Sequence, residues 1–241
     1  MYKDISPFGI NIDASTIGEA WVDLVDAILE HGKKSLDEDR GRLALQNVRL
    51  RISDVSLPDK IIEKYGDKEN IDAILHLTLK GDEMYDFDVV PSFSPGAKSY
   101  NARIKEGRMI EFVVKRLSNI PESKKAIISF IHWDDYKAVL DTPFDDYLPC
   151  ITTVQFRLLE DKDGLKMNVN FTARSIDAFQ KANGNIIAIV ALAQEVCGQL
   201  MTSLDKKIEI NAIDGFITDA HVYGECLEGA KAVVAKVRSE I

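Results

Sequence analysis

The stretch from residue 149 to residue 185 contains a cysteine, an arginine and an asparagine at spacings that could form an active site. Cys150 follows Pro149 at the start of one predicted strand, and Arg174 stands at the end of the next strand. If the two strands pair as a hairpin, the thiol and the guanidinium can face each other. A nearby positive charge favours the thiolate, which is the nucleophilic form of cysteine. The stretch therefore predicts nucleophilic catalysis.

A β-hairpin and a long helix must position these residues. Residues 151–160 and 165–175 flank the turn sequence Asp161-Lys162-Asp163-Gly164, and the second of them alternates apolar and polar side chains, a pattern typical of antiparallel hairpins. From Asn185 to about Ser203 the chain is apolar around much of a helical circumference. A central helix is expected there, and Cys197 inside it should be an inert buried thiol.

The rest of the chain mixes helices with strands and lacks the regular alternation of a doubly wound sheet. The ranges that follow are expectations from hydrophobic periodicity and from start and stop signals. Helices are expected over 16–32, with Thr16 and Glu19 as a capping box, over 58–65, over 104–117 and from about 224. Strands are expected over 43–52 with a break at 46–47, over 126–131, and over 207–213 and 216–222 around a turn at Asp214-Gly215. Residues 33–42 should form a charged loop and residues 89–100 an irregular connection, while 71–79 could be helix or strand. This order predicts one α+β domain over 1–241 with a largely antiparallel or mixed sheet.

Composition limits the possible functions. The chain has 241 residues, 46% of them hydrophobic, and a formal net charge of -9, which disfavours a general nucleic-acid or membrane-surface binder. The N-terminus lacks a signal-peptide core and no run of apolar residues is long enough to span a membrane, so a cytoplasmic protein is expected. The three cysteines should be free thiols. The histidines His31, His76 and His132 lack metal-ligand spacing, and no metal is predicted.

Several dispersed motifs in one order carry a family resemblance. They are Pro149-Cys150 followed by Gln155-Phe156; Arg174-Ser175 with Asp177 and Phe179; Asn185; and Asp219, His221 and Tyr223, with weaker matches at Asp39-Arg40 and at Ser123-Lys124-Lys125. Together they resemble the thymidylate synthase and pyrimidine-nucleotide hydroxymethylase family over about residues 100–223. The short chain is similar to the compact archaeal branch. The resemblance implies a thymidylate-synthase-like fold.

The resemblance also implies a role for each matching residue. Cys150 would be the nucleophile, activated by Arg174, which with Ser175 would hold the nucleotide phosphate. Further substrate contacts would come from Arg40, Lys124, Lys125, Gln155, Asn185, His221 and Tyr223. Asp177 would lie toward the pterin, and Glu63 is the best candidate for the catalytic glutamate. Lys124 and Lys125 would reach the phosphate of the partner subunit in a homodimer.

The implied reaction is transfer of a one-carbon unit from 5,10-methylenetetrahydrofolate, or a tetrahydromethanopterin analogue, to C5 of a pyrimidine nucleoside monophosphate through a cysteine–C6 adduct. Thymidylate synthesis from dUMP is expected, because Asn185 resembles the residue of the uracil-reading members. No nucleic-acid or membrane partner is implied.

Five substitutions keep other readings open. Ile151 stands where the family usually has histidine, Ala173 where it has glutamine and Lys181 where it has glycine, and the Lys124-Lys125 pair replaces two arginines. A CMP or dCMP hydroxymethylase of the same fold is therefore an alternative. A catalytically reduced, nucleotide-binding regulatory relative is a third hypothesis, from another functional class.

Overall fold

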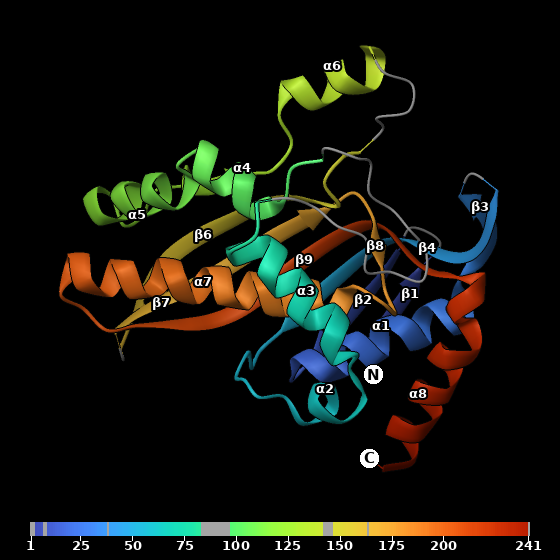
Figure 1. Ribbon diagram of the computed structural model, residues 1–241. Coiled ribbons are helices and arrows are strands. Elements are labelled where there is room, and N and C mark those ends of the chain that lie inside the picture. The colour runs from blue at the N-terminus through green and yellow to red at the C-terminus, as the bar shows by residue number, and fades with distance from the viewer. Residues whose placement is uncertain are drawn as a thin grey trace.

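One mixed β-sheet runs through the protein (Figure 1). The computed structural model describes residues 3–6, 9–37, 39–82, 97–141, 147–162 and 164–240. Within these residues nine strands form a sheet in the order β1-β2-β4-β9-β7-β6-β5, with β3 added to β4 and β8 to β9. The strands are β1 (Lys3–Ser6), β2 (Gly9–Ala14), β3 (Lys33–Asp37), β4 (Arg40–Ile52), β5 (Ile127–Ser129), β6 (Ile151–Asp161), β7 (Gly164–Ala173), β8 (Ile176–Asp177) and β9 (Ile208–Tyr223).

Parallel and antiparallel pairs coexist in this sheet. β9 pairs antiparallel with β4 but parallel with β7 and β8, and β2 and β4 are also parallel. The predicted α+β class with a mixed sheet is confirmed.

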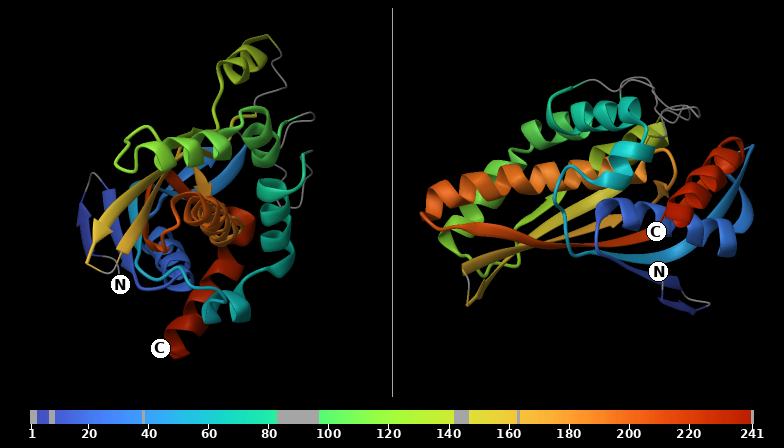
Figure 2. Two further views of the ribbon diagram at one scale, coloured as in Figure 1. Left: turned by 90° about the vertical axis from the view of Figure 1, so that its left-hand side faces the viewer. Right: turned by 90° about the horizontal axis from the view of Figure 1, so that it is seen from below.

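Helices cover one face of the sheet (Figure 2). They are α1 (Ile17–His31), α2 (Lys60–Tyr65), α3 (Lys68–Leu79), α4 (Tyr100–Glu106), α5 (Met109–Asn119), α6 (Trp133–Asp141), α7 (Ala182–Leu204) and α8 (Leu227–Glu240), with a short 3-10 turn, η1 (Gly224–Cys226), before α8. By length and composition α7 could span a membrane, but it packs against α1, α3, α5 and β9 in the core. The expectation of a long central helix is confirmed, with its start three residues earlier than Asn185.

The first helix forms as its sequence predicts. The Thr16 hydroxyl accepts the Glu19 N–H, and the Glu19 carboxylate in turn accepts the Ser15 N–H, so two N–H groups at the helix start are satisfied. The buried face of α1 includes Trp21, whose indole N–H donates to the Ala178 carbonyl at 3.0 Å. This bond ties α1 to the turn that follows β8.

The predicted hairpin is present, but the two predicted strands at 207–222 are one strand. β6 and β7 pair antiparallel from Ile151 opposite Ala173 to Asp161 opposite Gly164. β9 runs without a turn through Asp214 and Gly215. A Cβ on Gly215 would lie 2.3 Å from the ring of Phe171. The glycine therefore admits a core aromatic ring instead of making a turn.

Other expectations needed correction. The charged segment 33–42 is an antiparallel strand pair, β3 with the start of β4, and not a loop. The predicted break at 46–47 is a local one, because Asn47 has φ of 57° while β4 keeps its register with β9. The expected helix over 104–117 is two helices, separated where Arg108 adopts φ of 48°.

Three further expectations have separate outcomes. The ambiguous run 71–79 is helical, within α3. The short helix after Pro58 is confirmed as α2, with the Asp59 carboxylate as its cap. Most of the irregular connection at 89–100 lies outside the described residues.

The sheet face opposite the helices carries rows of polar side chains. One row runs across five strands through neighbouring positions, namely Asp13, Arg51, Asp214, Asn170 and Gln155. A hollow of about 470 Å³ lies over β2, β4, β9 and β7 on this face, bordered by Arg49, Arg51 and Phe216. We call this surface the open sheet face.

Candidate active site

The topology brings the predicted site residues to one end of the sheet. Ala173 at the end of β7 lies opposite Ile151 on one side and Ile217 on the other. Four residues further on, Asp177 of β8 pairs with His221 of β9, which in turn pairs with Ala44 of β4. The loop before β6, the segment after β7 and the end of β9 therefore meet, although Arg42 and its strand partner Tyr223 are 181 positions apart in the chain.

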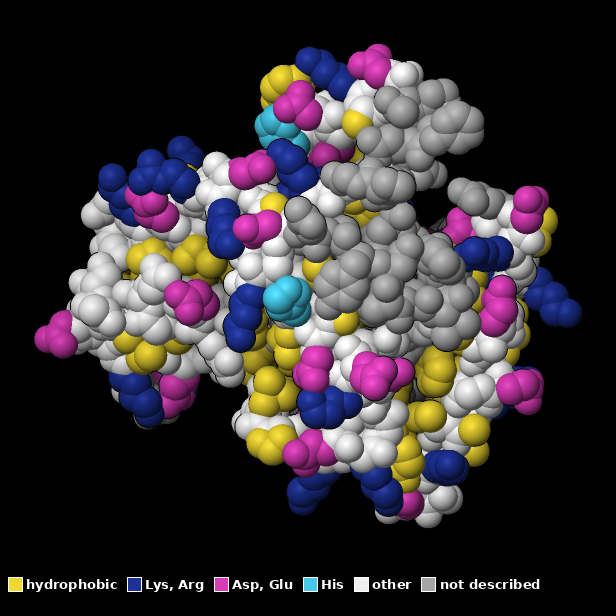
Figure 3. Space-filling model, viewed as in Figure 1, with side chains coloured by type: hydrophobic (Ala, Val, Ile, Leu, Met, Phe, Trp, Pro, Cys, Tyr) yellow, Lys and Arg dark blue, Asp and Glu magenta, His cyan; other side chains and the backbone are white. Residues whose placement is uncertain are grey.

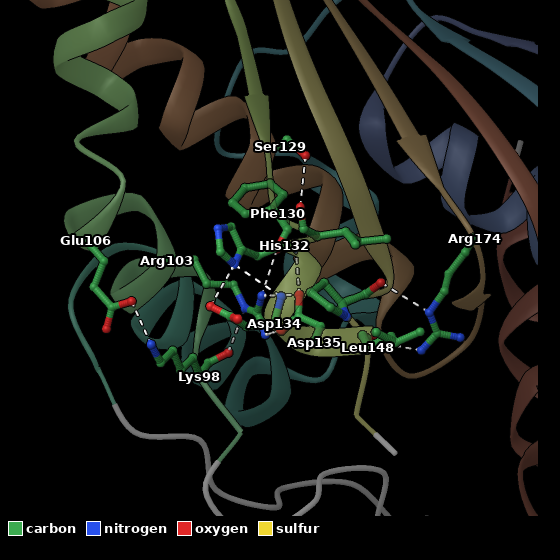
Figure 4. A network of polar contacts seen from close by, with 12 residues as sticks. Lys98, Arg103, Glu106, Ser129, Phe130, His132, Asp134, Asp135, Leu148 and Arg174 are labelled. Atoms are coloured by element: carbon green, nitrogen blue, oxygen red, sulfur yellow. Dashed lines mark hydrogen bonds and ion pairs between the residues drawn. The ribbon is translucent and has the colours of Figure 1, made fainter. Parts of the chain in front are cut away.

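Arg174 holds the loop that carries Cys150. Its Nη2 donates to the Leu148 carbonyl at 2.7 Å and its Nε to the Pro149 carbonyl at 3.2 Å (Figure 4). Its backbone N–H donates to the Cys150 carbonyl at 2.9 Å. The guanidinium is exposed, so it stays accessible to an anion while it orders the loop. The predicted proximity of this arginine to the Cys150 segment is therefore present in the structure.

Cys150 differs from the other two cysteines in its surroundings. It is partly accessible, whereas Cys197 and Cys226 are buried. Burial raises the pKa of the Cys197 thiol, and its Sγ donates to the Ile208 carbonyl at 3.3 Å. A buried protonated thiol is a poor nucleophile, and of the three cysteines Cys150 is the one that is not buried.

A tyrosine that the sequence did not single out lies beside this loop. The Tyr100 hydroxyl accepts the Ile151 N–H at 2.9 Å, and its ring packs edge-on against Phe130 with centroids 4.6 Å apart. Burial, together with the charges of Tyr147 and Cys150, raises the pKa of Tyr100 well above its usual range. Tyr100 therefore stays protonated and can act as a hydrogen-bond donor next to the nucleophile.

Asp177 is occupied largely by its own turn. One carboxylate oxygen accepts the N–H groups of Phe179 and Gln180, both at 3.1 Å, and the other accepts the Gln180 amide at 2.7 Å. A carboxylate offers about four acceptor positions, so about one remains for a ligand. The Phe179 ring stacks on Trp21 beside this turn.

Asn185 lies in the first turn of α7 and is buried, with 6% of its surface exposed. No hydrogen bond joins its side-chain amide to any residue in the part of the chain that the structure describes. Buried amides almost always have partners, so this one is available for a ligand. A side-chain amide offers both a donor and an acceptor, which is what the edge of a pyrimidine needs.

The end of β9 carries a connected polar cluster. The His221 Nδ1 lies 3.1 Å from Asp219 Oδ1, and Arg42 Nη1 lies 2.7 Å from the same oxygen. Burial alone would raise the pKa of Asp219, but the hydrogen bond from His221 and the charge of Arg42 lower it. The Tyr223 hydroxyl donates to Asp37 at 2.6 Å, and burial with this bond raises the pKa of Tyr223.

Three predicted substrate residues and the predicted base lie elsewhere. Gln155 is on the open sheet face, where its amide donates to the Lys124 carbonyl at 2.9 Å. Lys124 and Lys125 are exposed at the start of β5, and five residues of extended strand, about 17 Å, separate Gln155 from Cys150. Arg40, by contrast, opens β4 opposite Asp37, whose carboxylate accepts the Tyr223 hydroxyl of the polar cluster. Glu63 is exposed on α2, which packs against α1, so its role as a base stays a prediction.

A buried ion pair supports the site from the side of α4. Arg103 donates twice to the Asp135 carboxylate, both at 2.8 Å, and once to the Phe130 carbonyl at 2.8 Å (Figure 4). Asp135 also accepts the His132 N–H at 2.7 Å. A cavity of about 440 Å³ lies beside this pair and is bordered by Tyr147. The network joins α4, the end of β5 and the start of α6.

The face of the protein in Figure 3 has acidic and basic side chains interspersed, without a broad basic area among the coloured residues. This agrees with the acidic net charge. The described residues contain no group of three or more His, Cys, Asp or Glu side chains placed to hold a metal ion.

Sequence reasoning missed Tyr100, the contact between Arg42 and Asp219, and the Arg103–Asp135 pair. Tyr100 is the first residue of α4, and the hydroxyl of Ser99 before it accepts the Ala102 N–H as a helix cap. The signal that the sequence offered here was a serine that could begin a helix at Tyr100. Arg42 and Asp219 are brought together only by strand pairing over 177 residues, which no local pattern reveals.

Comparison with known proteins identifies the family. The family model described as thymidylate synthase matches residues 85–241, which is more than half of the chain and includes Cys150, Arg174, Asn185 and His221. No curated protein matches the chain. The matched region contains the hairpin, the central helix and the polar cluster at the end of β9. The chain belongs to the thymidylate synthase family.

Proposed function

We propose that the protein transfers a one-carbon unit to C5 of a pyrimidine nucleoside monophosphate, with dUMP as the preferred substrate and thymidylate as the product. Membership of the thymidylate synthase family supports methyl or hydroxymethyl transfer to pyrimidine C5. Three observations support the residue-level proposal: Cys150 is partly accessible, Arg174 orders its loop, and the buried amide of Asn185 has no hydrogen-bond partner among the described residues.

Cys150 acts as the nucleophile. Its thiolate adds to C6 of the pyrimidine, a C6–S bond forms, and the π electrons of the C5–C6 bond move toward C5 and the C4 carbonyl. C5 then carries the nucleophilic electron pair that bonds to the one-carbon unit. Loss of the C5 proton and cleavage of the bond between the one-carbon unit and its carrier leave an exocyclic methylene at C5. Hydride from the reduced pterin, or water, then adds to this methylene as the C6–S bond breaks, which releases the thiolate and restores the ring. Asn185 holds the pyrimidine edge during these steps.

Basic and hydroxyl groups bind the rest of the nucleotide. Arg174 and Ser175 take the phosphate, since a planar guanidinium suits a phosphate fork and Arg174 is exposed beside Cys150. Arg40 adds a contact from β4. His221 and Tyr223 bind the sugar hydroxyl at the end of β9.

The reduced pterin, methylenetetrahydrofolate or a tetrahydromethanopterin analogue, supplies the one-carbon unit and, for a methyl product, the hydride. Asp177 would hold it, since its carboxylate keeps about one acceptor position after three internal hydrogen bonds. The fit is limited to that single bond. The Gln180 amide beside it keeps the carboxylate oriented.

The chain offers an interface for a second copy. The open sheet face is polar and uncovered by helices among the described elements, and Lys124 and Lys125 are exposed at its edge. Pairing of two such faces in a homodimer would carry the lysines toward the phosphate site of the other subunit. We expect a cytoplasmic enzyme with free thiols. Its placement in the compact archaeal branch stays a prediction.

A spectrophotometric assay tests methyl transfer. The protein is mixed with dUMP and methylenetetrahydrofolate, and absorbance growth from dihydrofolate is followed, with Cys150→Ser as the inactive variant and Cys197→Ser as the matched control. Dihydrofolate formation by the wild type and the control alone supports the proposal. Absence of dihydrofolate, together with the absence of a covalent adduct, contradicts it.

A hydroxymethyl product is the second candidate, and one contact favours it. Ile151 and Ala173, which replace the histidine and glutamine usual in the family, face each other across the hairpin beside Cys150 and are 4% and 2% exposed. An apolar pair at this position removes polar groups from the surroundings of the nucleophile. Release of tritium from C5 of CMP or dCMP without dihydrofolate would assign this reaction, and release from uridine nucleotides alone would exclude it.

A further inference from the structure

The partly buried Arg42 is not explained by any family motif found in the sequence. It lies on β4 at the position opposite Tyr223, and its guanidinium grips both oxygens of Asp219, at 2.7 Å and 3.3 Å. The arginine side chain is 15% exposed and that of Asp219 is 20% exposed. Asp219 also contacts His221. The Nδ1 of His221 lies 3.1 Å from Asp219 Oδ1, the same oxygen that accepts a hydrogen bond from Arg42 Nη1 at 2.7 Å.

This chain of contacts fixes the protonated nitrogen of the histidine. An ionised carboxylate only accepts hydrogen bonds, so the Nδ1 of His221 must carry the proton that Asp219 accepts. In the neutral form of the ring, Nε2 is then the acceptor. Nε2 has no hydrogen bond to any residue in the described part of the chain, and it is therefore the atom left for a ligand hydroxyl.

We propose that Arg42 acts through Asp219 as the positioning residue that fixes the orientation and the protonated nitrogen of His221. The consequence for sugar binding rests on the proposed function, in which His221 accepts a hydrogen bond from the sugar hydroxyl. Arg42 itself touches no substrate in this account. It keeps Asp219 ionised and holds the carboxylate in the plane that the imidazole requires.

A role in stability alone does not explain this arginine. A buried ion pair can often be replaced by apolar residues without loss of stability. In addition, the Nε of Arg42 is buried and has no hydrogen-bond partner among the described residues, which is a cost to folding. Fold stability alone therefore does not account for an ion pair, rather than apolar side chains, at this position on β4 and β9.

A second arginine on the same strand provides a matched control. Arg51 of β4 also pairs with an aspartate of β9, Asp214, at 3.2 Å. That pair is on the open sheet face, with side chains 51% and 33% exposed, and no histidine contact is described for it. The same substitution can thus be made at both arginines.

Two readouts test the proposal. The first is the imidazole ¹⁵N spectrum of histidine-labelled protein, with His221 assigned from a His221→Gln variant; it shows directly which nitrogen carries the proton. The second is the ratio of the dissociation constants for 2′,3′-dideoxyuridine monophosphate and dUMP, which measures the contact to the sugar hydroxyl. Both are recorded for the wild type, Arg42→Gln, Arg42→Lys, Asp219→Asn and Arg51→Gln, after urea unfolding has shown that each variant is folded.

We expect protonated Nδ1 in the wild type and Arg51→Gln, and a mixture of both neutral forms in Arg42→Gln and Asp219→Asn. The wild-type affinity ratio should be about tenfold, the value of one hydrogen bond, and should fall to about twofold in Arg42→Gln. Arg42→Lys should recover part of both signals because it restores the charge.

An unchanged Nδ1 signal in folded Arg42→Gln overturns the proposal, as does an equal effect of Arg51→Gln. If Arg42→Gln does not fold, Arg42→Lys and Asp219→Asn decide the matter. Failure of the wild type to bind either nucleotide would contradict the proposed function, while the ¹⁵N spectrum would still decide whether Arg42 positions His221.

Discussion

Replacing Arg103 with methionine should destabilise the protein strongly, because it leaves a buried carboxylate without its cation. Arg103 and Asp135 have side chains only 8% and 13% exposed, and the guanidinium also donates to the Phe130 and Lys98 carbonyls. Breaking a buried pair from one side costs about 3–5 kcal/mol. At the lower figure, the Tm of a chain of this size should fall by about 6–12 °C.

Urea unfolding at neutral pH measures this loss. The matched control is Arg108→Met, since Arg108 forms an ion pair with Glu111 whose side chains are 74% and 56% exposed. Such exposed pairs contribute at most about 1 kcal/mol. Adding Asp135→Asn to Arg103→Met should restore part of the lost stability, because the variant then buries no unpaired charge.

The pH dependence supplies an independent check. Burial alone would raise the pKa of Asp135, but the hydrogen bonds from Arg103 and the His132 N–H lower it. In the wild type the stabilisation is present above the unfolded pKa and is lost as the pH falls through the lower folded value. Without Arg103 the buried carboxyl has a raised pKa, so protonation relieves the unpaired charge. The difference in unfolding free energy between wild type and Arg103→Met should therefore shrink between pH 6 and about pH 4.

A loss in Arg103→Met no larger than in Arg108→Met would refute this reasoning. A difference that grows as the pH falls would refute it as well, because it would mean that Asp135 is not the unpaired group.

Three other substitutions give defined outcomes. Arg174→Gln should lower kcat/KM about 100-fold in the dihydrofolate assay, since it removes two hydrogen bonds to the Cys150 loop worth about 1.4 kcal/mol each; an unchanged value would show that the loop is ordered without them. Tyr100→Phe should lose about 1–3 kcal/mol in urea unfolding, because the buried Ile151 N–H loses its acceptor, and wild-type stability would contradict that bond. Gly215→Ala should lose about 1–3 kcal/mol by overpacking against Phe171, whereas Gly198→Ala in α7, where a Cβ meets nothing within 4 Å, should gain about 0.5–1 kcal/mol; equal effects would reject the packing argument.

The sequence predicted elements whose signals are local. The hairpin at 151–173, the capped helix α1 and the core helix α7 each have a periodic pattern and a start or stop signal. The prediction of a turn at Asp214-Gly215 was wrong because the glycine serves a distant ring, that of Phe171. The prediction of a loop at 33–42 was wrong because charged residues also occur in edge strands. Their charge there hinders pairing with the edge of another sheet.

The site was predictable only in part for the same reason. Cys150 and Arg174 are linked by a hairpin, which a local pattern reveals. Arg42 and Asp219 meet through the pairing of β4 with β9, and Tyr100 reaches Ile151 from a separate helix. Contacts of this kind depend on the tertiary fold, and periodicity along the chain contains no information about them.

The central claim is that Cys150 forms a covalent bond to a pyrimidine nucleotide, and intact-protein mass spectrometry tests it most directly. Wild-type protein is incubated with 5-fluoro-dUMP and methylenetetrahydrofolate, because fluorine at C5 cannot leave as a proton and the adduct persists. We predict a gain of one nucleotide plus one carrier per chain in the wild type and in Cys197→Ser, and no gain in Cys150→Ser. A wild type that binds the nucleotide without gaining mass, or an adduct that persists in Cys150→Ser, would contradict the account.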